Sequence, residues 1–117
     1  MKLFASLFTK KLLLIIPTLI FSNSNYIEPD SYTKEGFCVV KTPEQKYLGL
    51  LRFESQEEFR NKCNGKMIFE YERYGCVKFT MENMKFDIYI SNTEKKYLFR
   101  IGEIIDICGK EIIETIE

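Results

Sequence analysis

Residues 66–90 read KMIFEYERYGCVKFTMENMKFDIYI, and the side chains of this stretch predict one another's positions. If Arg73–Gly75 is a three-residue hairpin loop, Phe69 lies opposite Phe79, and the other apolar residues of the two arms also find apolar partners. Gly75 then occupies the left-handed conformation that such loops favour. The pattern therefore predicts a hairpin centred on these three residues.

A second turn at Glu82-Asn83 extends the same arrangement. It places Phe79 opposite Phe86 on the face that the first hairpin already made apolar. The two registers are deduced separately and agree with each other. Residues 67–90 are therefore predicted to form a three-stranded antiparallel meander.

Charged residues on the opposite face support this register. Lys78 is expected between Glu70 and Asp87, and a slip of one residue would separate all three side chains. Exposed pairs contribute only about 0.2 to 1 kcal/mol each, so the trio selects the register more than it stabilises the sheet.

The chain begins with the features of a secretory signal peptide. Three lysines precede an apolar run from Leu12 to Phe21, and small polar residues follow it. The run is shorter than the roughly 20 residues of a membrane span. We expect a signal peptide at 1–24, a flexible lead-in at 25–35, and a single secreted domain at 36–117 without a membrane span after cleavage. The alternative for the first segment is a buried N-terminal helix.

The charge of the mature chain disfavours two classes of partner. Without the three lysines of residues 1–24, the 17 basic residues fall to 14, against 17 acidic ones, which gives a net charge of −3. A mildly acidic chain without a basic stripe is a poor ligand for nucleic acid or anionic membranes.

Four cysteines, Cys38, Cys63, Cys76 and Cys108, all follow the predicted signal peptide. An even number of cysteines in a small exported chain is typical of disulfides, each of which stabilises by about 2 to 4 kcal/mol. The three possible connectivities remain open, with Cys38–Cys63 and Cys76–Cys108 favoured. A four-cysteine zinc site is the alternative, but the close C-x-x-C pair typical of such sites is missing from the sequence.

The remaining segments complete a mainly β domain that borders on α+β. Ser55 and Glu58 form a capping box, which together with Asn64-Gly65 predicts a short helix at 56–63. The fold is expected to be a small antiparallel sheet or β-sandwich stapled by disulfides. The other expected strands are Phe37–Lys41, Lys46–Phe53 (after a turn at Thr42–Gln45), Tyr97–Ile101 and Ile104–Cys108, while the tail at 110–117 is either an edge strand or a helical turn.

Two short motifs, Phe86–Tyr89 and Ile107-Cys108-Gly109, are similar to the end of plant self-incompatibility protein homologues. The resemblance covers about a third of the chain and implies a small secreted β-sandwich that acts as a ligand. Leu98 or Phe99 stands where that family has tryptophan, and the cysteines fit its pattern poorly. The chain is therefore not assigned to the family.

The sequence contains no histidine, which removes histidine-based nucleophile pairs, acid/base pairs and metal ligands. Carboxylate catalysis would need residues such as Asp87, Glu103 and Asp106. Asp87 is already explained by its expected pairing with Lys78, and Asp106 by the alternation of its strand. We expect neither an enzyme nor a cofactor or metal site.

The expected function is binding of an unknown extracellular protein, with Arg73 and Tyr74 at the hairpin tip as the possible contact. The Lys-, Ile-, Asn-, Phe- and Tyr-rich composition is typical of AT-rich genomes, many of which belong to parasites and symbionts, and this favours the hypothesis of a host-directed effector. One alternative is a structural protein of the cell envelope or spore coat. A second is a small carboxylate-dependent hydrolase or a small-ligand carrier, which requires an unfilled cavity or a pocket lined by acidic residues.

Overall fold

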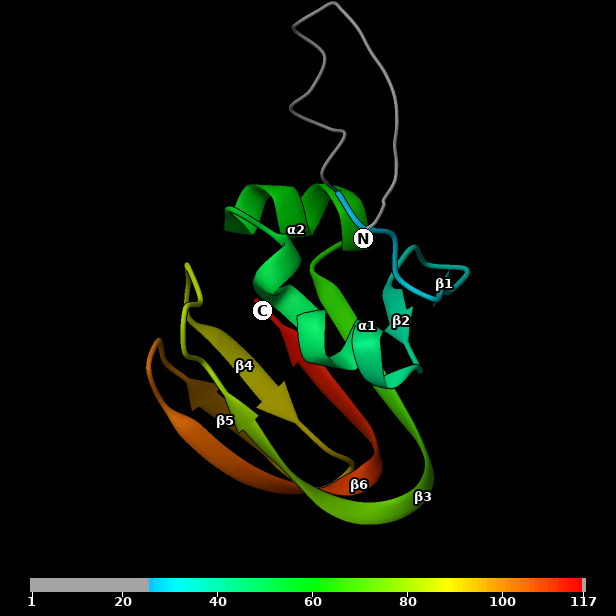
Figure 1. Cartoon of the computed structure of the whole chain (residues 1–117), viewed down its shortest axis with the longest axis vertical. Coiled ribbons are helices and arrows are strands. Elements are labelled where there is room, and N and C mark those ends of the chain that lie inside the picture. Colours follow the sequence, from blue (N-terminus) through cyan, green and yellow to red (C-terminus); the bar gives the residue numbers. More distant parts are fainter. Residues whose placement is uncertain (1–25, 117) are drawn as a thin grey trace, which may run out of the picture.

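One mixed sheet of six strands, in the order β1-β2-β3-β6-β4-β5, organises the part of the chain that the computed structural model describes, residues 26–116 (Figure 1). The signal peptide predicted at 1–24 lies outside these residues. The mainly β class with a short helix and two disulfides is confirmed, as a single six-stranded sheet with two short α-helices. The elements are β1 (Ser31–Tyr32), β2 (Cys38–Val40), α1 (Pro43–Leu48), the 3-10 helix η2 (Gly49–Arg52), α2 (Gln56–Cys63), β3 (Lys66–Thr80), β4 (Ile88–Ser91), β5 (Lys96–Phe99) and β6 (Ile104–Thr115).

The long antiparallel pair of β3 and β6 forms a ribbon that bends back on itself (Figure 1). The pairing register shifts between Glu70 and Gly75, at the position of the bend. In a straight strand Phe69 and Phe79, which are ten positions apart, would be separated by about 33 Å. The centroids of their two rings are instead 5.1 Å apart, in an edge-to-face contact. The two arms of the ribbon therefore face each other across the interior of the domain.

The hairpin predicted at Arg73–Gly75 is wrong. These residues lie inside β3, and Gly75 does not have the positive φ that the loop would require. The twelve-residue strand β6 pairs with β3 on both sides of this segment, so residues 73–75 keep a strand conformation. The residues of β3 between Glu70 and Gly75 that have no partner in β6 form an irregularity in the pairing. The predicted contact of Phe69 with Phe79 exists, but the bend produces it.

The predicted meander at 67–90 is likewise wrong beyond β3. The turn at Glu82-Asn83 does form, with Asn83 at φ 66° and the Met84 amide donating to the Met81 carbonyl at 3.2 Å. The chain does not return to β3 after this turn, because β4 pairs with β5 and with the end of β6.

The expected charge trio around Lys78 is replaced by a single pair across the β3–β6 ribbon. The Lys78 ammonium lies 3.0 Å from a carboxylate oxygen of Asp106. Asp87 instead accepts a hydrogen bond of 2.9 Å from the Ile101 amide. The error has the same cause as the wrong hairpin, since both assume that β3 pairs with itself.

The strand predicted at Lys46–Phe53 is wrong, because this segment is helical. Thr42 caps α1 by accepting from the Gln45 amide at 3.3 Å, and Pro43 occupies the first turn. Thr-Pro followed by an acidic residue is a helix start, although the same letters also suit a turn. The apparent alternation through Tyr47 misled the interpretation, since this side chain is 85% exposed.

Helix α2 has the predicted bounds and caps. The Ser55 hydroxyl accepts from the Glu58 amide at 3.1 Å, and Asn64 ends the helix in the left-handed conformation. The return bond of the capping box is displaced by one residue, because the Glu58 carboxylate accepts from the Glu54 amide at 2.8 Å. Phe59 and Cys63 face the core, as their i, i+4 spacing predicts.

Both favoured disulfides are present. Cys38–Cys63 closes the helical crossover between the parallel strands β2 and β3, and both cysteines are fully buried. Cys76–Cys108 joins directly opposed residues of β3 and β6, where Cys76 is exposed. Two disulfides are typical of an oxidising, extracellular-type environment.

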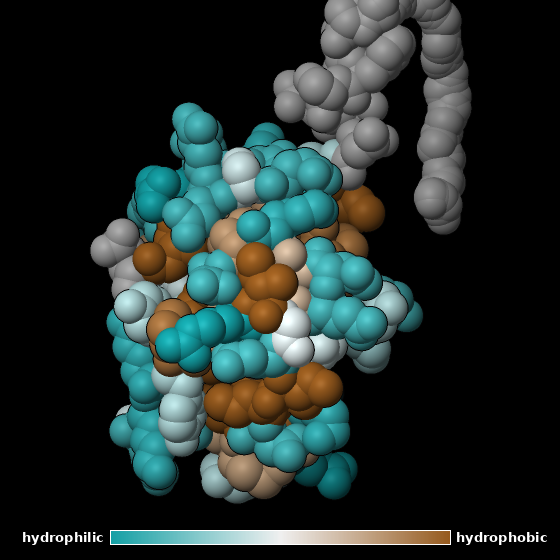
Figure 2. Space-filling model, turned by 90° about the vertical axis from the view of Figure 1, so that its left-hand side faces the viewer, coloured by the Kyte–Doolittle hydropathy of each residue, from teal (hydrophilic) through white to brown (hydrophobic). Residues whose placement is uncertain are grey.

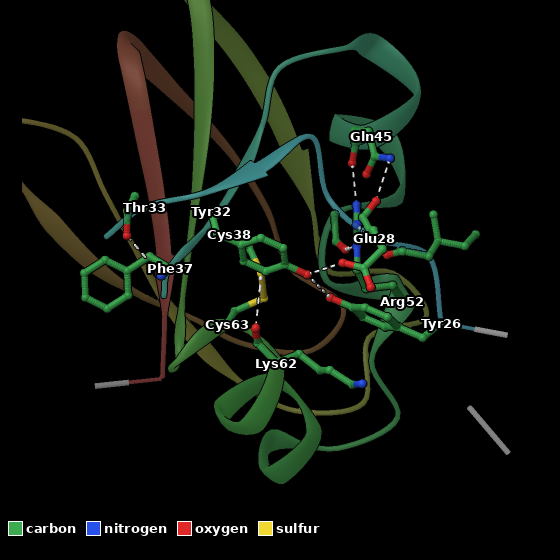
Figure 3. Close-up of a disulfide and its surroundings, with 12 residues drawn as sticks. Tyr26, Glu28, Tyr32, Thr33, Phe37, Cys38, Gln45, Arg52, Lys62 and Cys63 are labelled. Atoms are coloured by element: carbon green, nitrogen blue, oxygen red, sulfur yellow. Dashed lines mark hydrogen bonds between the residues drawn. A yellow bond between two sulfur atoms is a disulfide. The ribbon is translucent and has the colours of Figure 1, made fainter. Parts of the chain in front are cut away.

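Arg52 fixes the start of the described chain against the helices (Figure 3). Its guanidinium is buried and donates to the carbonyls of Gly49 at 2.7 Å, Ile27 at 2.9 Å and Gln45 at 3.0 Å. Burial lowers the pKa of Arg52. Within the stretch 25–35, where a flexible lead-in was expected, β1 pairs with β2.

The core lies between the bent sheet and its helical cover. A chain of aromatic rings, Tyr26, Phe53, Phe59 and Phe86, runs through it with centroid separations of 5.9, 5.2 and 6.2 Å. The tail left undecided at 110–117 continues β6 as a strand to Thr115. Among residues 26–116, no helix has the length and apolar character of a bilayer span.

Candidate functional site

A groove of about 710 Å³ lies between the α1–η2 segment and the bent part of β3. Most of its surface is apolar. The sheet contributes the side chains of Phe69, Tyr71, Val77 and Phe79, and the turn at 81–84 contributes one rim. The groove therefore occupies the space that the bend of β3 opens beneath its helical cover.

Gly49 allows the cover to approach the sheet at one end of the groove. A Cβ at this position would lie 3.3 Å from the ring of Phe69, and its φ of 43° favours glycine. The six-residue helix α1 and the four-residue η2 are too short to cover the whole bend. The close contact at Gly49 is thus followed by an unfilled stretch toward Tyr71 and Val77.

Glu114 is the buried polar residue that lines this groove. Strand pairing places it directly between Met67 of β3 and Ile90 of β4, both fully buried, on the inner face of the sheet. The residue is only 5% exposed, and among residues 26–116 its carboxyl group has no hydrogen-bond or ion-pair partner. Desolvation alone raises its pKa to about 8.

The two lysines that line the groove already have partners. Lys46 lies 3.7 Å above the centroid of the Tyr71 ring, and burial lowers its pKa. Lys78 is paired with Asp106 at 3.0 Å. Burial, followed by the charge of Glu114, raises the pKa of Tyr71. An unpartnered carboxyl group facing an open, largely apolar space can receive a donor or cation from a bound molecule.

The residues predicted to contact a partner, Arg73 and Tyr74, lie at the bend of β3 and not at a hairpin tip. Both are exposed, Tyr74 to 72%, and neither lines the groove. A protein contact there stays a prediction. The carboxylates considered for catalysis, Asp87, Asp106 and Glu103, bond to Ile101, Lys78 and Arg100 respectively and also lie outside the groove.

Apolar side chains exposed outside the groove are dispersed. Leu98, Ile101 and Ile104 are among them, on β5, in the following turn and at the start of β6. Figure 2 shows a side of the molecule on which separate apolar patches alternate with hydrophilic ones.

Glu114 is a site residue that the sequence did not predict, because the pattern of the tail suits a strand and a helical turn equally. Once 104–115 is a strand, its alternation places Glu114 on the same face as the buried Ile112. A carboxylate on an otherwise apolar face of a strand would have indicated Glu114 as a candidate site residue. Residues 26–116 contain no cluster of three or more potential metal ligands.

Comparisons of this chain with protein-family models, curated proteins and solved structures find no significant match.

Proposed function

We propose that the protein is an exported, non-catalytic binding protein that holds a small apolar molecule in the groove between α1–η2 and the bend of β3. Among the alternatives considered from the sequence, the carboxylate-dependent hydrolase or small-ligand carrier requires a pocket lined by acidic residues or an unfilled cavity. The groove, with Glu114 in its wall, is the observation that carries the proposal. Its volume of about 710 Å³ lies within the range of about 300 to 1,000 Å³ common for small-molecule sites.

The composition of the groove supports binding of an apolar body. Aromatic and aliphatic side chains from both arms of the ribbon line it, and apolar surface predominates over polar surface. Binding is favoured when a ligand replaces water on such a surface, by about 25 cal/mol per Å² of apolar area buried. The two disulfides and the β3–β6 ribbon hold the walls in place, so little ordering is needed on binding.

Nile red, a neutral apolar dye whose emission rises and shifts to the blue in apolar surroundings, tests the proposal. The oxidised protein should bind it at a single saturable site. Val77→Phe adds a ring inside the groove and should weaken binding by about tenfold or more, equivalent to about 1.4 kcal/mol. Ile104→Phe adds the same ring on an exposed position opposite Thr80 and should leave binding unchanged.

Two results would refute the groove as the binding site. One is the absence of Nile red binding to the wild-type protein. The other is an equal loss of binding in both phenylalanine variants, or no loss in either, because the dye would then sit elsewhere. Urea unfolding of each variant verifies that the folded state is retained before binding is compared.

Export is the second part of the proposal and rests on the apolar run from Leu12 to Phe21 together with the two disulfides. The intact mass of the protein recovered outside the producing cell should correspond to a chain that begins near Asn25. Reduction should add four hydrogens. An uncleaved chain with four free thiols would contradict export.

A protein contact at Arg73 and Tyr74 is a second candidate function. It is favoured by the 72% exposure of Tyr74 close to the disulfide that ties β3 to β6. Tyr74→Ala distinguishes the two functions, because it should weaken capture of a protein partner and leave Nile red binding unchanged.

A further inference from the structure

We infer that the groove takes a molecule with an apolar body and a protonated amine, and that the amine pairs with the carboxylate of Glu114. This inference rests on the proposed function of the groove and specifies the chemistry of its ligand. Three features of the described residues carry it: the position of Glu114, its lack of a partner, and the engagement of the two lysines nearby.

The position of Glu114 makes an isolated charge unfavourable there. Met67 and Ile90 flank it in the sheet and are fully buried, so the carboxyl group has apolar neighbours on both sides. A carboxylate in such surroundings is strongly disfavoured unless a cation or several donors compensate it. Within residues 26–116 no such group contacts it, while its side chain borders the open groove. The compensating group can therefore arrive with a ligand.

The walls of the groove also suit a cation with an apolar chain. Phe69, Tyr71 and Phe79 contribute aromatic rings to the lining. The faces of aromatic rings attract cations, and the attraction is larger where water is excluded. An ammonium group also forms a charge-assisted hydrogen bond to a carboxylate, which is roughly twice as strong as a neutral one.

The charged groups on the other elements around Glu114 do not favour an anionic ligand. Lys46 of α1 lies over the Tyr71 ring, and the acidic side chains of Asp30, Glu72 and Glu70 act on it. Lys78 of β3 pairs with Asp106. The turn after β3 contributes the further carboxylate of Glu82, and β4 contributes apolar Ile90.

Amine binding should release a proton from Glu114. With a pKa of about 8 in the free protein, the carboxyl group is almost fully protonated at pH 6 to 7. An alkylamine, whose pKa is about 10.4 like that of lysine, is already charged at these pH values. The pairing therefore takes one proton from the carboxyl group and transfers it to the buffer, and the affinity for the amine should rise about tenfold from pH 6 to pH 7.

The experiment compares three probes of equal chain length, octylamine, 1-octanol and octanoate, with the oxidised protein. NMR titration gives the affinities, and calorimetry in two buffers of different ionisation enthalpy gives the proton release. Octylamine should bind about tenfold or more tightly than the other two and release about one proton at pH 6.5. Glu114→Gln should abolish both the preference and the proton release, whereas Glu111→Gln, which removes an exposed carboxylate from the same strand, should change neither.

Several outcomes would overturn the inference. Equal binding of all three probes, a preference for octanoate, or retention of the amine preference and proton release in Glu114→Gln would each show that this carboxyl group does not select the ligand. If Nile red still binds in the groove, only the amine inference fails. If neither Nile red nor any octyl probe binds, the proposed function fails as well. Should Glu114→Gln fail to fold, the proton release of the wild-type protein decides the question.

Discussion

The replacement Glu114→Gln should change how the stability of the domain depends on pH between pH 4.5 and pH 8.5. The ordinary pKa of a glutamate is 4.5, and burial raises that of Glu114 to about 8. Between these two values the folded state binds more protons at this group than the unfolded chain does. The free energy of unfolding therefore falls as pH rises through this window.

The size of the effect follows from the two pKa values. Each pKa difference of one corresponds to about 1.4 kcal/mol, so the range from 4.5 to about 8 corresponds to roughly 5 kcal/mol. Glutamine does not titrate. Relative to the wild type, the Glu114→Gln variant should gain most of this amount between pH 4.5 and pH 8.5, with little difference from the wild type at the acidic end.

Urea unfolding with intact disulfides, followed by far-ultraviolet circular dichroism at several pH values, measures this difference. Other titrating groups contribute to both proteins and largely cancel when the two curves are subtracted. Glu111→Gln on the exposed face should show no comparable trend. A wild-type minus variant difference that stays constant from pH 4.5 to 8.5, or that favours the wild type as pH rises, would refute the account of Glu114 as a buried, uncompensated acid.

Two further predictions concern the disulfides and the buried hydrogen-bonding residue Arg52. Cys76–Cys108 should be reduced and alkylated before Cys38–Cys63 under mild dithiothreitol, because thiol attack needs access: Cys76 is exposed, whereas Cys38 and Cys63 are fully buried. Timed alkylation and mass spectrometry give the order, and simultaneous reduction would contradict it. Arg52→Met should lower the free energy of unfolding by about 3 kcal/mol, since it removes three hydrogen bonds, one buried and two part-buried, that the guanidinium donates to main-chain carbonyls. Urea unfolding measures the loss, and a change below about 0.5 kcal/mol would contradict a structural role.

The locally determined elements of this fold were predictable from the sequence. Ser55 and Asn64 delimit α2 through short-range hydrogen bonds and backbone preferences, so its bounds follow from the letters alone. The turn at Glu82-Asn83 is equally local. Apart from the helical segment predicted as a strand at Lys46–Phe53, the wrong interpretations concern long-range choices, above all whether β3 pairs with its own second half or with β6. Apolar residues alternate along β3 with a period of two, and this alternation is compatible with both pairings. The periodicity therefore did not decide between them.

The site was harder to predict than the fold because it depends on the least local feature of the chain. The groove exists only when β3 bends and α1–η2 lies across the bend. The sequence pattern instead predicts a hairpin in the first segment and a strand in the second. The disulfides narrowed the possible arrangements and were predicted correctly, yet neither of them borders the groove. A strand assignment for the tail would have revealed Glu114 as an acid on an apolar face, but not what lies in front of it.

The unfavourable position of Glu114 links the stability of the domain to its proposed ligand. Near neutral pH the fold should carry a penalty of a few kcal/mol for this group, and a glutamine or methionine would avoid it. A bound amine compensates the charge and binds only the folded state, so it should stabilise the domain by RT ln(1 + [L]/Kd), about 2.7 kcal/mol at a hundredfold excess over Kd. Octylamine should consequently raise the urea midpoint of the wild type more at pH 7 than at pH 6, and octanol should not. Equal stabilisation by both probes at both pH values would show that the carboxyl group of Glu114 takes no part in ligand recognition and that its burial has only a structural role.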